Sequence, residues 1–322
     1  GYMSIHLDYA QTGELIKNID NVYILTHQSP DGDTIGSGFA LYYALTDMGK
    51  NAKVLCSDKF HKRYDFITQN YNDTNFQPEY IISTDVADTK LLGSLKELYK
   101  NDIYLCIDHH ISNMEYSKYL LLSANSSANC EVVYKLFKAM GVTLTEQIAK
   151  CLYTGIATDT GCFKFSNCNA ETHRIVSEIM EIFPNINYAE INRLMFDVKS
   201  HARIRAEREA LDNITYYLDG KVSVICITNE MINRLNMSLD DFEGLTGLST
   251  QTEGVEVGIT MKEMEKDTFK ISLRSVNDVN VSKVCQKFGG GGHIKAGGCK
   301  IDNTPVEKVI SMLVDAIAEE LN

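Results

Sequence analysis

Four short segments of the sequence concentrate carboxylates and imidazoles, the side chains that bind divalent metals in proteins. They are THQSPDGDTIGS at residues 26–37, ISTDVAD at 82–88, IDHHISN at 107–113 and TGIATDTGCF at 154–163. Taken singly, the first is typical of an Asp-Gly turn, the second of a helix cap and the fourth of a helix end. Taken together, their mixed oxygen and nitrogen donors suit Mn²⁺ better than Ca²⁺ or a structural Zn²⁺.

The third segment is the strongest single signal. Asp108, His109 and His110 follow an apolar run, and polar groups at the end of a buried strand are costly without partners. A core histidine explains one such residue but rarely two. In the first segment, we expect a loop whose curvature points His27, Asp31 and Asp33 inward.

The elements around these segments alternate between short apolar runs and helix-like stretches. The expected strands are Val22–Leu25, Val54–Cys56, Tyr80–Ile82 and Ile103–Ile107, and the expected helices include Ile35–Met48, Leu91–Tyr99 and Thr145–Thr158. Such alternation predicts an α/β fold, with a parallel sheet covered by helices on both faces. Because ligands gather at the carboxyl ends of parallel strands, His27, Asp85 and Asp108 should share one edge. Asp159 should reach that edge from a helix end.

The length of 322 residues argues for two domains at roughly 150 residues each. Strands at Val222–Ile227, Val255–Thr260 and Phe269–Leu273, followed by a helix at Val306–Leu321, predict a second, smaller α/β domain. We expect a metal-binding catalytic domain at 1–197, a linker helix at 198–211 and a substrate-binding domain at 212–322. The basic run at 199–208 fits a solvated linker face better than a guide for a nucleotide.

The four acidic segments resemble, in order and character, the four motifs of the DHH phosphoesterase family. Near the C-terminus, SLRS at 272–275 and GGGGHIKAGGC at 289–299 look like the signature of the DHH-associated nucleotide-binding domain. The two-domain layout is similar to the NrnA-like branch, the nanoRNases and 3′-phosphoadenosine 5′-phosphate (pAp) phosphatases. This set of motifs is highly specific for the family and less specific for the substrate.

The resemblance implies two Mn²⁺ ions in the active site, with Mg²⁺ or Co²⁺ as possible replacements. The implied ligands are His27, Asp31 and Asp85 for one ion and Asp33, Asp85, His109 and Asp159 for the other, with Asp85 bridging. Asp108 would orient the ligands, and His110 would face the scissile phosphate. Two such ions supply a nucleophile at neutral pH and clamp the phosphoryl oxygens during displacement.

The resemblance also implies that the C-terminal domain chooses the substrate. Gly290, Gly291 and Gly292 would let the backbone approach a phosphate or base closely, and Arg274 and His293 would contact a terminal phosphate. Ser275 and Lys295 are weaker candidates for the same pocket. Without the resemblance, the glycine run is also consistent with a flexible turn. It lacks the Gly-Lys-Ser/Thr of a Walker loop, so it does not indicate an ATPase.

The composition limits the classes of partner. The 31 Lys and Arg against 43 Asp and Glu leave a net charge of −12, which argues against a non-specific binder of duplex DNA. No apolar stretch reaches the ~18 residues of a membrane helix. Nine cysteines without a C-x-x-C pair, and no signal-peptide pattern at the N-terminus, favour a cytoplasmic protein with reduced thiols. The oligomeric state stays open, with a homodimer as one option.

We therefore expect a Mn²⁺-dependent phosphoesterase that trims oligoribonucleotides of two to five nucleotides to mononucleotides, removes the 3′-phosphate of pAp, or does both. Within the superfamily, the alternatives are hydrolysis of linear or cyclic dinucleotides and of inorganic pyrophosphate or polyphosphate. A non-catalytic nucleotide sensor is the alternative from another class. The complete set of metal ligands argues against a sensor, which usually has a degraded metal motif.

Overall fold

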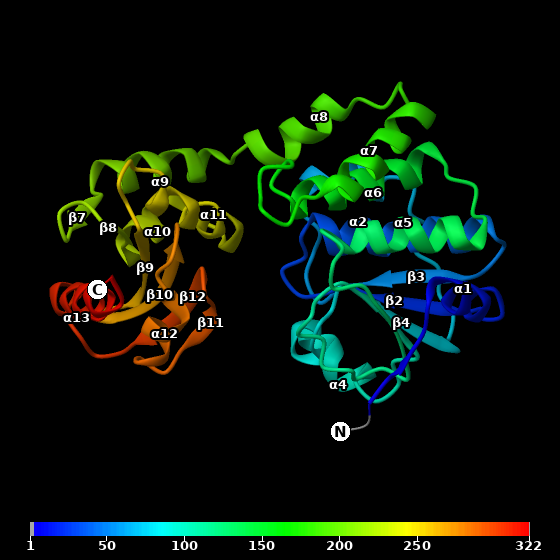
Figure 1. Cartoon of the computed structure of the whole chain (residues 1–322), viewed down its shortest axis with the longest axis horizontal. Helices are drawn as coiled ribbons and strands as arrows, with labels where there is room; N and C mark the ends of the chain where they lie inside the picture. The colour runs from blue at the N-terminus through cyan, green and yellow to red at the C-terminus, as the bar shows by residue number, and fades with distance from the viewer. Residues whose placement is uncertain (1–2, 322) are drawn as a thin grey trace. The chain divides into compact units, whose positions relative to one another are not determined.

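In the computed structural model, which describes residues 3–321, the chain divides into two compact units (Figure 1). The first unit is Gly1–Val198 and the second is Lys199–Asn322. Each unit has its own six-stranded sheet and its own hydrophobic core. The two-domain α/β architecture expected from the sequence is confirmed.

The first unit is built on a parallel sheet with the strand order β1-β6-β5-β4-β2-β3. The strands are β1 (Ile5–His6), β2 (Val22–Leu25), β3 (Ala52–Leu55), β4 (Tyr80–Thr84), β5 (Leu105–Asp108) and β6 (Tyr119–Leu122). Every neighbouring pair runs parallel, which fits the continuous apolar composition of the central strands β2, β4 and β5. Strands β1 and β6, at one side of the sheet, were not among the expected strands.

Helices cover both faces of this sheet (Figure 1). The α-helices of the unit are α1 (Tyr9–Lys17), α2 (Gly32–Asp47), α3 (Asp65–Thr68), α4 (Lys96–Tyr99), α5 (Asn129–Met140), α6 (Glu146–Asp159), α7 (Ala170–Ile182) and α8 (Tyr188–Asn192). The larger core joins one face to α2, α5 and α6 through residues such as Phe39, Phe137 and Leu152. The smaller core on the other face includes Leu92 and Leu95, which belong to the 3₁₀ segment Thr89–Leu95 before α4.

Two glycines allow α6 to pack closely against α2 and α5. A Cβ atom at Gly36 would collide with the carbonyl oxygen of Cys151 on α6, and one at Gly155 would collide with the thiol of Cys130 on α5. Any larger side chain would therefore push the helices apart. This packing brings the N-terminal end of α2 beside the C-terminal half of α6, where two of the acidic segments lie.

The second unit has a mixed sheet with the strand order β11-β12-β10-β9-β8-β7. Its strands are β7 (Thr215–Tyr217), β8 (Val222–Ile227), β9 (Val257–Glu265), β10 (Thr268–Ser275), β11 (Gly291–His293) and β12 (Ala296–Ile301). Only the β8–β9 pair is parallel. Part of the glycine run, for which the sequence left a flexible turn open, therefore forms β11, an edge strand paired with β12.

Helices lie against both faces of this second sheet. They are α9 (His201–Asp212), α10 (Asn229–Leu235), α11 (Leu239–Glu243), α12 (Val281–Gln286) and α13 (Val306–Leu321). The core under α12 and α13 includes Phe269, Ile271 and Leu273 of β10. A separate cluster joins Ala206 and Ala210 of α9 to strand β8. The segment expected as a linker thus overlaps α9, which packs within the second unit.

The described part of the chain, residues 3–321, contains no helix that is long and apolar enough to cross a membrane. All nine cysteines carry free thiols.

Candidate functional site

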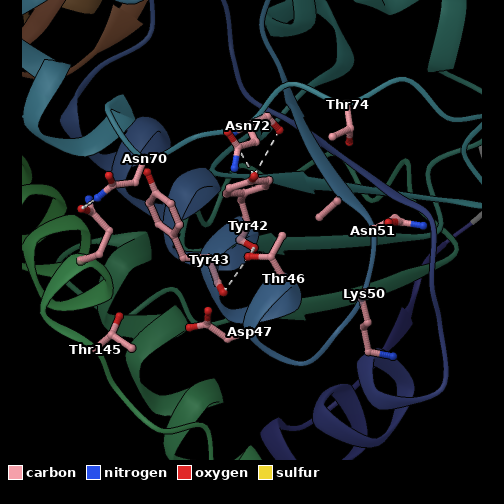
Figure 2. A pocket seen from close by; sticks show the side chains of 12 residues that line it. Tyr42, Tyr43, Thr46, Asp47, Lys50, Asn51, Asn70, Asn72, Thr74 and Thr145 are labelled. Carbon is pink, nitrogen blue, oxygen red and sulfur yellow. Dashed lines mark hydrogen bonds between the residues drawn. The ribbon is translucent and has the colours of Figure 1, made fainter.

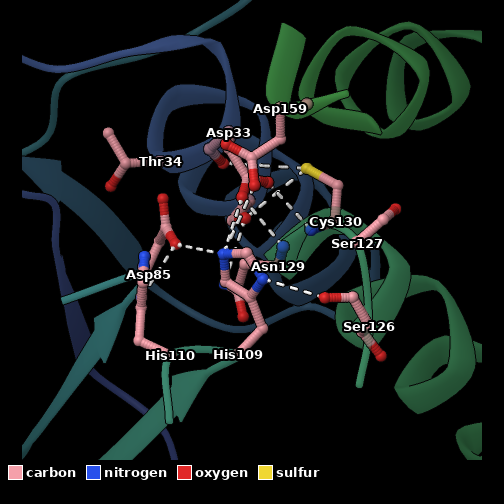
Figure 3. Close-up of polar contacts among 12 residues, drawn as sticks. Asp33, Thr34, Asp85, His109, His110, Ser126, Ser127, Asn129, Cys130 and Asp159 are labelled. Atoms are coloured by element: carbon pink, nitrogen blue, oxygen red, sulfur yellow. Dashed lines mark hydrogen bonds and ion pairs between the residues drawn. The ribbon is translucent and has the colours of Figure 1, made fainter. Parts of the chain in front are cut away.

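The four acidic segments meet at the carboxyl edge of the parallel sheet, as the strand pattern predicted (Figure 3). His27 lies just beyond β2, Asp85 directly follows β4, and Asp108 ends β5 with His109 and His110 next in sequence. Helices supply the remaining carboxylates, because Asp31 and Asp33 lie at the start of α2 and Asp159 is the last residue of α6. Residues up to 132 positions apart in sequence, 27 and 159, thus share one site.

The structure differs from the sequence expectation at the start of α2. The segment with Asp31 and Asp33 is not a curved loop, because the helix begins at Gly32, three residues earlier than predicted. The Asp31 side chain caps it by accepting hydrogen bonds from the backbone N–H groups of Asp33 and Thr34. Asp33 therefore sits in the first helical turn, fully buried and with one fixed direction for its carboxylate.

Three groups of possible metal ligands, which share some members, lie among the described residues. Within each group, the donor atoms lie within 4.8 Å of one another. The groups are His27 with Asp31 and Asp85, Asp33 with His109 and Asp159, and Asp85 with His109 and His110. The His109 Nε2 atom lies 3.5 Å from Asp33 Oδ2 and 3.3 Å from Asp85 Oδ1. It is also 3.5 Å from Asp159 Oδ2. All six side chains that the sequence analysis nominated as ligands are brought together.

Two buried atoms in this cluster fit the role of metal ligands. Asp85 Oδ1 and His109 Nε2 are inaccessible to solvent and have no hydrogen-bond partner among the described residues. The other ring nitrogen of His109 lies 3.1 Å from the backbone carbonyl of Ser126, and that of His27 lies 2.7 Å from the carbonyl of Gln28. A carbonyl only accepts, so each Nδ1 carries the proton and each Nε2 presents a lone pair. The donor set therefore fits a divalent metal.

The Asp33 carboxylate is held by the start of α5. It accepts hydrogen bonds from the backbone N–H groups of Asn129 at 2.8 Å and Cys130 at 2.9 Å. The N-cap residue of α5, Ala128, makes no side-chain capping bond, so Asp33 satisfies amides that the helix itself leaves free. Sequence reasoning missed this support, because an alanine at an N-cap does not indicate which distant side chain replaces it.

The carboxylates of the edge repel one another. Burial, reinforced by the charge of Asp33, raises the pKa of Asp85 well above its ordinary value. Burial and the Asp33 carboxylate likewise raise the pKa of Asp159, to about 9. Burial would lower the pKa of His109, but the charges of Asp33 and Asp159 outweigh it and raise that pKa. Since these acids resist losing their protons together, a bound cation would stabilise their ionised forms.

Asp108 and His110 form a hydrogen-bonded pair beside the ligand cluster. His110 Nδ1 lies 2.7 Å from Asp108 Oδ1, and Asn113 donates a 2.8 Å hydrogen bond to Asp108 Oδ2. Burial works to raise the pKa of Asp108, but these two hydrogen bonds outweigh it and lower that pKa. Asn113 was not among the predicted site residues, although it lies inside the quoted IDHHISN segment. The His110 side chain is 42% exposed against 10% for His109, so its Nε2 is available to a ligand.

The backbone at Asp85 is unusual. Its φ of 63° lies in the left-handed region, which Asp tolerates better than most residues. The Asp85 N–H donates to the carbonyl of Ile107 on β5, which continues the sheet pairing one residue past β4. The alternative for this segment taken alone, in which Asp85 caps the next helix, does not hold, because Asp88 caps it. The turn instead directs the Asp85 side chain into the cluster.

In the second unit, strand pairing brings Arg274 and His293 to one face of the sheet. Arg274 of β10 is opposite Ala296 of β12, and Ala296 is opposite His293 of β11. Residues paired across strands share a face, whereas neighbours along a strand alternate. Ser275 therefore points to the other face, where it is buried and its hydroxyl has no partner among the described residues. The structure does not bring Ser275 together with Arg274.

The three nominated glycines have different surroundings. A Cβ atom at Gly290 would overlap the carbonyl oxygen of Gly298, so this position needs glycine for close packing of the hairpin. Gly292 has a φ of 135°, which excludes ordinary side chains. Gly291 has open space where a side chain would be and lies on the same face as His293.

The first unit also has a cavity of about 460 Å³ away from the acidic edge (Figure 2). Its lining includes Tyr42, Tyr43, Asp47, Asn70 and Asn72. Asp47 ends α2, and at 1.5 Å per residue it lies roughly 20 Å along the helix from Asp33. The cavity contains none of the metal-ligand groups, and some of its polar atoms bond to one another, as Tyr42 does to the backbone of Asn72. It is therefore separate from the acidic edge.

Comparison with known proteins identifies the family. The DHH family N-terminal domain matches residues 21–156, and the DHHA1 domain matches residues 221–322. The chain therefore belongs to the DHH family of phosphoesterases and is a phosphoester hydrolase by class. This confirms the resemblance seen in the four acidic segments and in the glycine-rich C-terminal segment.

Individual relatives agree with this assignment. The chain is 28% identical over 314 residues, 96% of its length and 93% of the relative's, to the bifunctional oligoribonuclease and PAP phosphatase NrnA of Thermus thermophilus. It is 23% identical, over 68% of its length and 75% of the relative's, to a probable manganese-dependent inorganic pyrophosphatase of Streptococcus mutans. The crystal structure of an exopolyphosphatase-related protein from Bacteroides fragilis shares the fold. Its TM-score is 0.86 at 24% identity, over 97% of this chain and 95% of that one.

Proposed function

We propose that this protein is a Mn²⁺-dependent phosphoesterase that hydrolyses short oligoribonucleotides to mononucleotides and removes the 3′-phosphate of pAp. The observation that carries the proposal is the metal-ligand cluster with its two unpartnered buried atoms, in a chain similar to NrnA over 96% of its length. We also propose that it acts in the cytoplasm, in keeping with its nine free thiols.

The donor set supports two ions of the manganese type. His27, Asp31 and Asp85 would hold one ion, and Asp33, Asp85, His109 and Asp159 would hold the other, with Asp85 shared. Carboxylates mixed with imidazoles suit Mn²⁺, and the similarity to a probable manganese-dependent pyrophosphatase supports the same ion. When bound, two such ions activate water and stabilise the phosphoryl oxygens of an in-line displacement. Mg²⁺ or Co²⁺ are the replacements to test.

The chain's own residues have separate tasks in this mechanism. The backbone amides of Asn129 and Cys130 fix the direction of the Asp33 carboxylate, so that a ligand position is ready before substrate arrives. The Asp108 carboxylate binds His110 Nδ1 and leaves Nε2 facing outward. From that position, His110 would stabilise charge on the scissile phosphate or give a proton to the leaving oxygen.

The second unit would supply substrate binding. Arg274 and His293 share one face of its sheet, beside a glycine strand that lets a ligand approach the backbone. An Arg guanidinium holds a phosphate through paired N–H groups. Gly290, Gly291 and Gly292 would serve the close approach, whereas Ser275 would contribute only if its strand rearranged.

The first test is product analysis of a 5′-phosphorylated diadenylate incubated with the Mn²⁺-loaded full chain. We expect AMP as the product, and none from Asp33→Asn, which removes a ligand charge without changing the size of the side chain. A dinucleotide that survives with the intact chain would contradict the oligoribonuclease assignment. Parallel incubation with pAp tests the phosphatase activity separately.

Hydrolysis of inorganic pyrophosphate is the second candidate, and the similarity to the Streptococcus mutans pyrophosphatase favours it. That relative covers only 68% of this chain, whereas NrnA covers 96%. An inorganic substrate also has no base or sugar for the second unit to bind. Release of phosphate from pyrophosphate, with both nucleotide substrates left intact, would decide for this candidate.

A further inference from the structure

Three lysines stand in one row across the sheet of the second unit. Lys262 of β9 is directly opposite Lys270 of β10, and Lys270 is directly opposite Lys300 of β12. Neighbouring residues in such rows have Cα atoms about 5 Å apart, and like charges placed directly opposite destabilise a sheet. In a chain with a net charge of −12, a row of three cations requires a physical explanation.

Salt bridges do not explain the row. Lys300 lies 3.6 Å from Asp302, but neither Lys262 nor Lys270 has an acidic partner within 4.0 Å in the described part of the chain. The Lys262 ammonium instead lies over the ring of Phe242, 4.0 Å from its centroid. This cation–π contact holds the side chain in place and leaves its charge without a counter-ion.

The row borders a cavity of about 320 Å³ on the same face of the sheet. Its lining includes Thr260, Lys262, Lys270, Ser272 and Arg274 from the strands, with Leu239, Phe242, Glu243 and Thr246 forming the opposite wall. The lining therefore holds three cationic side chains, those of Lys262, Lys270 and Arg274. It holds one carboxylate, that of Glu243. The Thr260 hydroxyl is buried in this lining and has no hydrogen-bond partner among the described residues. A ligand that is anionic and accepts hydrogen bonds matches these groups.

The cations lie at two separated positions. Arg274 is four residues along β10 from Lys270, which corresponds to about 13 Å at 3.3 Å per residue. Ser272 lies between them on the same face, so the path is lined by polar groups. One phosphate bound at Arg274 would leave the lysine position unfilled. A chain with several phosphates would fill both.

We propose that Lys262 and Lys270 form a second phosphate subsite, which binds a further phosphate of an oligoribonucleotide longer than a dinucleotide while Arg274 binds the terminal one. The inference rests on the proposed function and extends it to substrate length. Phe242 positions Lys262, and Thr260 donates its hydroxyl to the same phosphate. A diadenylate and pAp are too short to occupy the subsite.

The test compares substrates of two lengths. The double variant Lys262→Gln/Lys270→Gln should raise the KM for 5′-phosphorylated tetra-adenylate about tenfold and leave its kcat unchanged. The KM for 5′-phosphorylated diadenylate should change less than twofold. Each lost phosphate contact of a single strand removes about 0.7 from the slope of log affinity against log salt, so losing this one contact should reduce the slope for the tetranucleotide by about 0.7.

A matched control and a rescue make the result specific. Lys308→Gln removes one positive charge from an exposed position of α13, whose packing residues lie on the other face of the sheet, and should leave both KM values unchanged. Lys270→Arg keeps the charge and should retain normal tetranucleotide binding. Equal changes for the two substrates, or an unchanged tetranucleotide KM, would overturn the subsite. Thermal unfolding of each variant checks that the fold is intact.

Direct binding separates this inference from the proposed function. In the Asp33→Asn full chain, fluorescent tetra-adenylate should bind about tenfold more tightly than when the two lysines are also replaced. If the intact chain turns over no oligonucleotide, the proposed function fails, and this comparison still decides on the subsite. Unlabelled tripolyphosphate serves as competitor. Competition equal to that of unlabelled tetra-adenylate would assign the lysines to inorganic phosphate chains and overturn the oligonucleotide assignment.

Discussion

The acidic edge of the first unit and the basic face of the second are built in opposite ways. The edge collects buried carboxylates and imidazoles from strands and helices that are distant in sequence, and backbone amides hold Asp33 in place. The basic face places long cationic side chains on adjacent strands of one antiparallel hairpin, partly open to solvent. A rigid buried cluster suits chemistry on one bond, whereas cationic side chains spread along a partly open face suit binding of a charged chain.

The largest effect should come from breaking the acidic edge. Asp33→Asn should lower kcat/KM at least about 10³-fold, or about 4 kcal/mol of transition-state stabilisation, since tenfold corresponds to 1.36 kcal/mol. Bound metal, measured by mass spectrometry, should fall with it. Asp47→Asn changes the same residue type at the other end of α2 and should leave activity intact. An active Asp33→Asn with full metal content would remove Asp33 from the ligand set.

A substitution at His110 distinguishes catalytic groups of the acidic edge from metal ligands. His110→Ala should lower kcat about 10²-fold, the usual scale for a lost proton-transfer or charge-stabilising group. The metal content should stay at the level of the intact chain, because Nδ1 of His110 is already bonded to Asp108. Loss of metal together with activity would instead make His110 a ligand, in the group that it forms with Asp85 and His109.

The buried acids should also make stability depend on pH. In the folded metal-free chain, Asp159 keeps its proton up to about pH 9, whereas its ordinary pKa is 3.8. Between these values the folded state binds more protons than the unfolded state, so the free energy of unfolding falls as pH rises. Mn²⁺ binds the folded chain, so at a free concentration of a hundred times its Kd it should add about 2.7 kcal/mol to the free energy of unfolding.

Chemical denaturation at pH 6 and pH 9 measures this effect. The comparison variant is Asp159→Asn, which cannot ionise and should show a smaller loss of stability between the two pH values. An identical loss in both proteins would show that Asp159 does not carry the pH dependence.

The smallest effect is expected on the basic face. Arg274→Ala should raise the KM for diadenylate about tenfold, or about 1.4 kcal/mol of binding, with kcat within twofold. Arg208→Ala, an exposed arginine on α9, is the control for loss of one positive charge. Steady-state kinetics distinguish the outcomes, because a fall in kcat without a change in KM would move Arg274 from binding to catalysis.

Much of the acidic edge could be predicted because its signals are local. Each ligand lies at the end of an apolar strand or of a helix with an ordinary sequence pattern, so β2, β4, β5 and α6 were close to their observed bounds. Motif order then supplied the family. Strands β1 and β6, at one side of the sheet, escaped notice, because β1 has two residues and β6 is a short run that no Asp or His follows directly.

Contacts between residues that are distant in sequence could not be predicted. Nothing near Asp33 in sequence indicates that its carboxylate caps α5, 96 residues away. The glycine run left a flexible turn open, because glycine is uncommon in strands and does not announce one, yet pairing with β12 makes part of it an edge strand. The faces of Arg274 and Ser275 follow from strand alternation only after the strand bounds are known.

The sequence by itself determined which donor atoms are present, their order along the chain and the family to which the chain belongs, because these are properties of residue type and local spacing. Only the tertiary structure decided which groups meet. It brought His109 between three carboxylates, turned its Nε2 toward them through a bond to Ser126, and aligned Lys262 with Lys270. Such contacts depend on strand register and helix packing between distant segments, which local residue preferences do not specify.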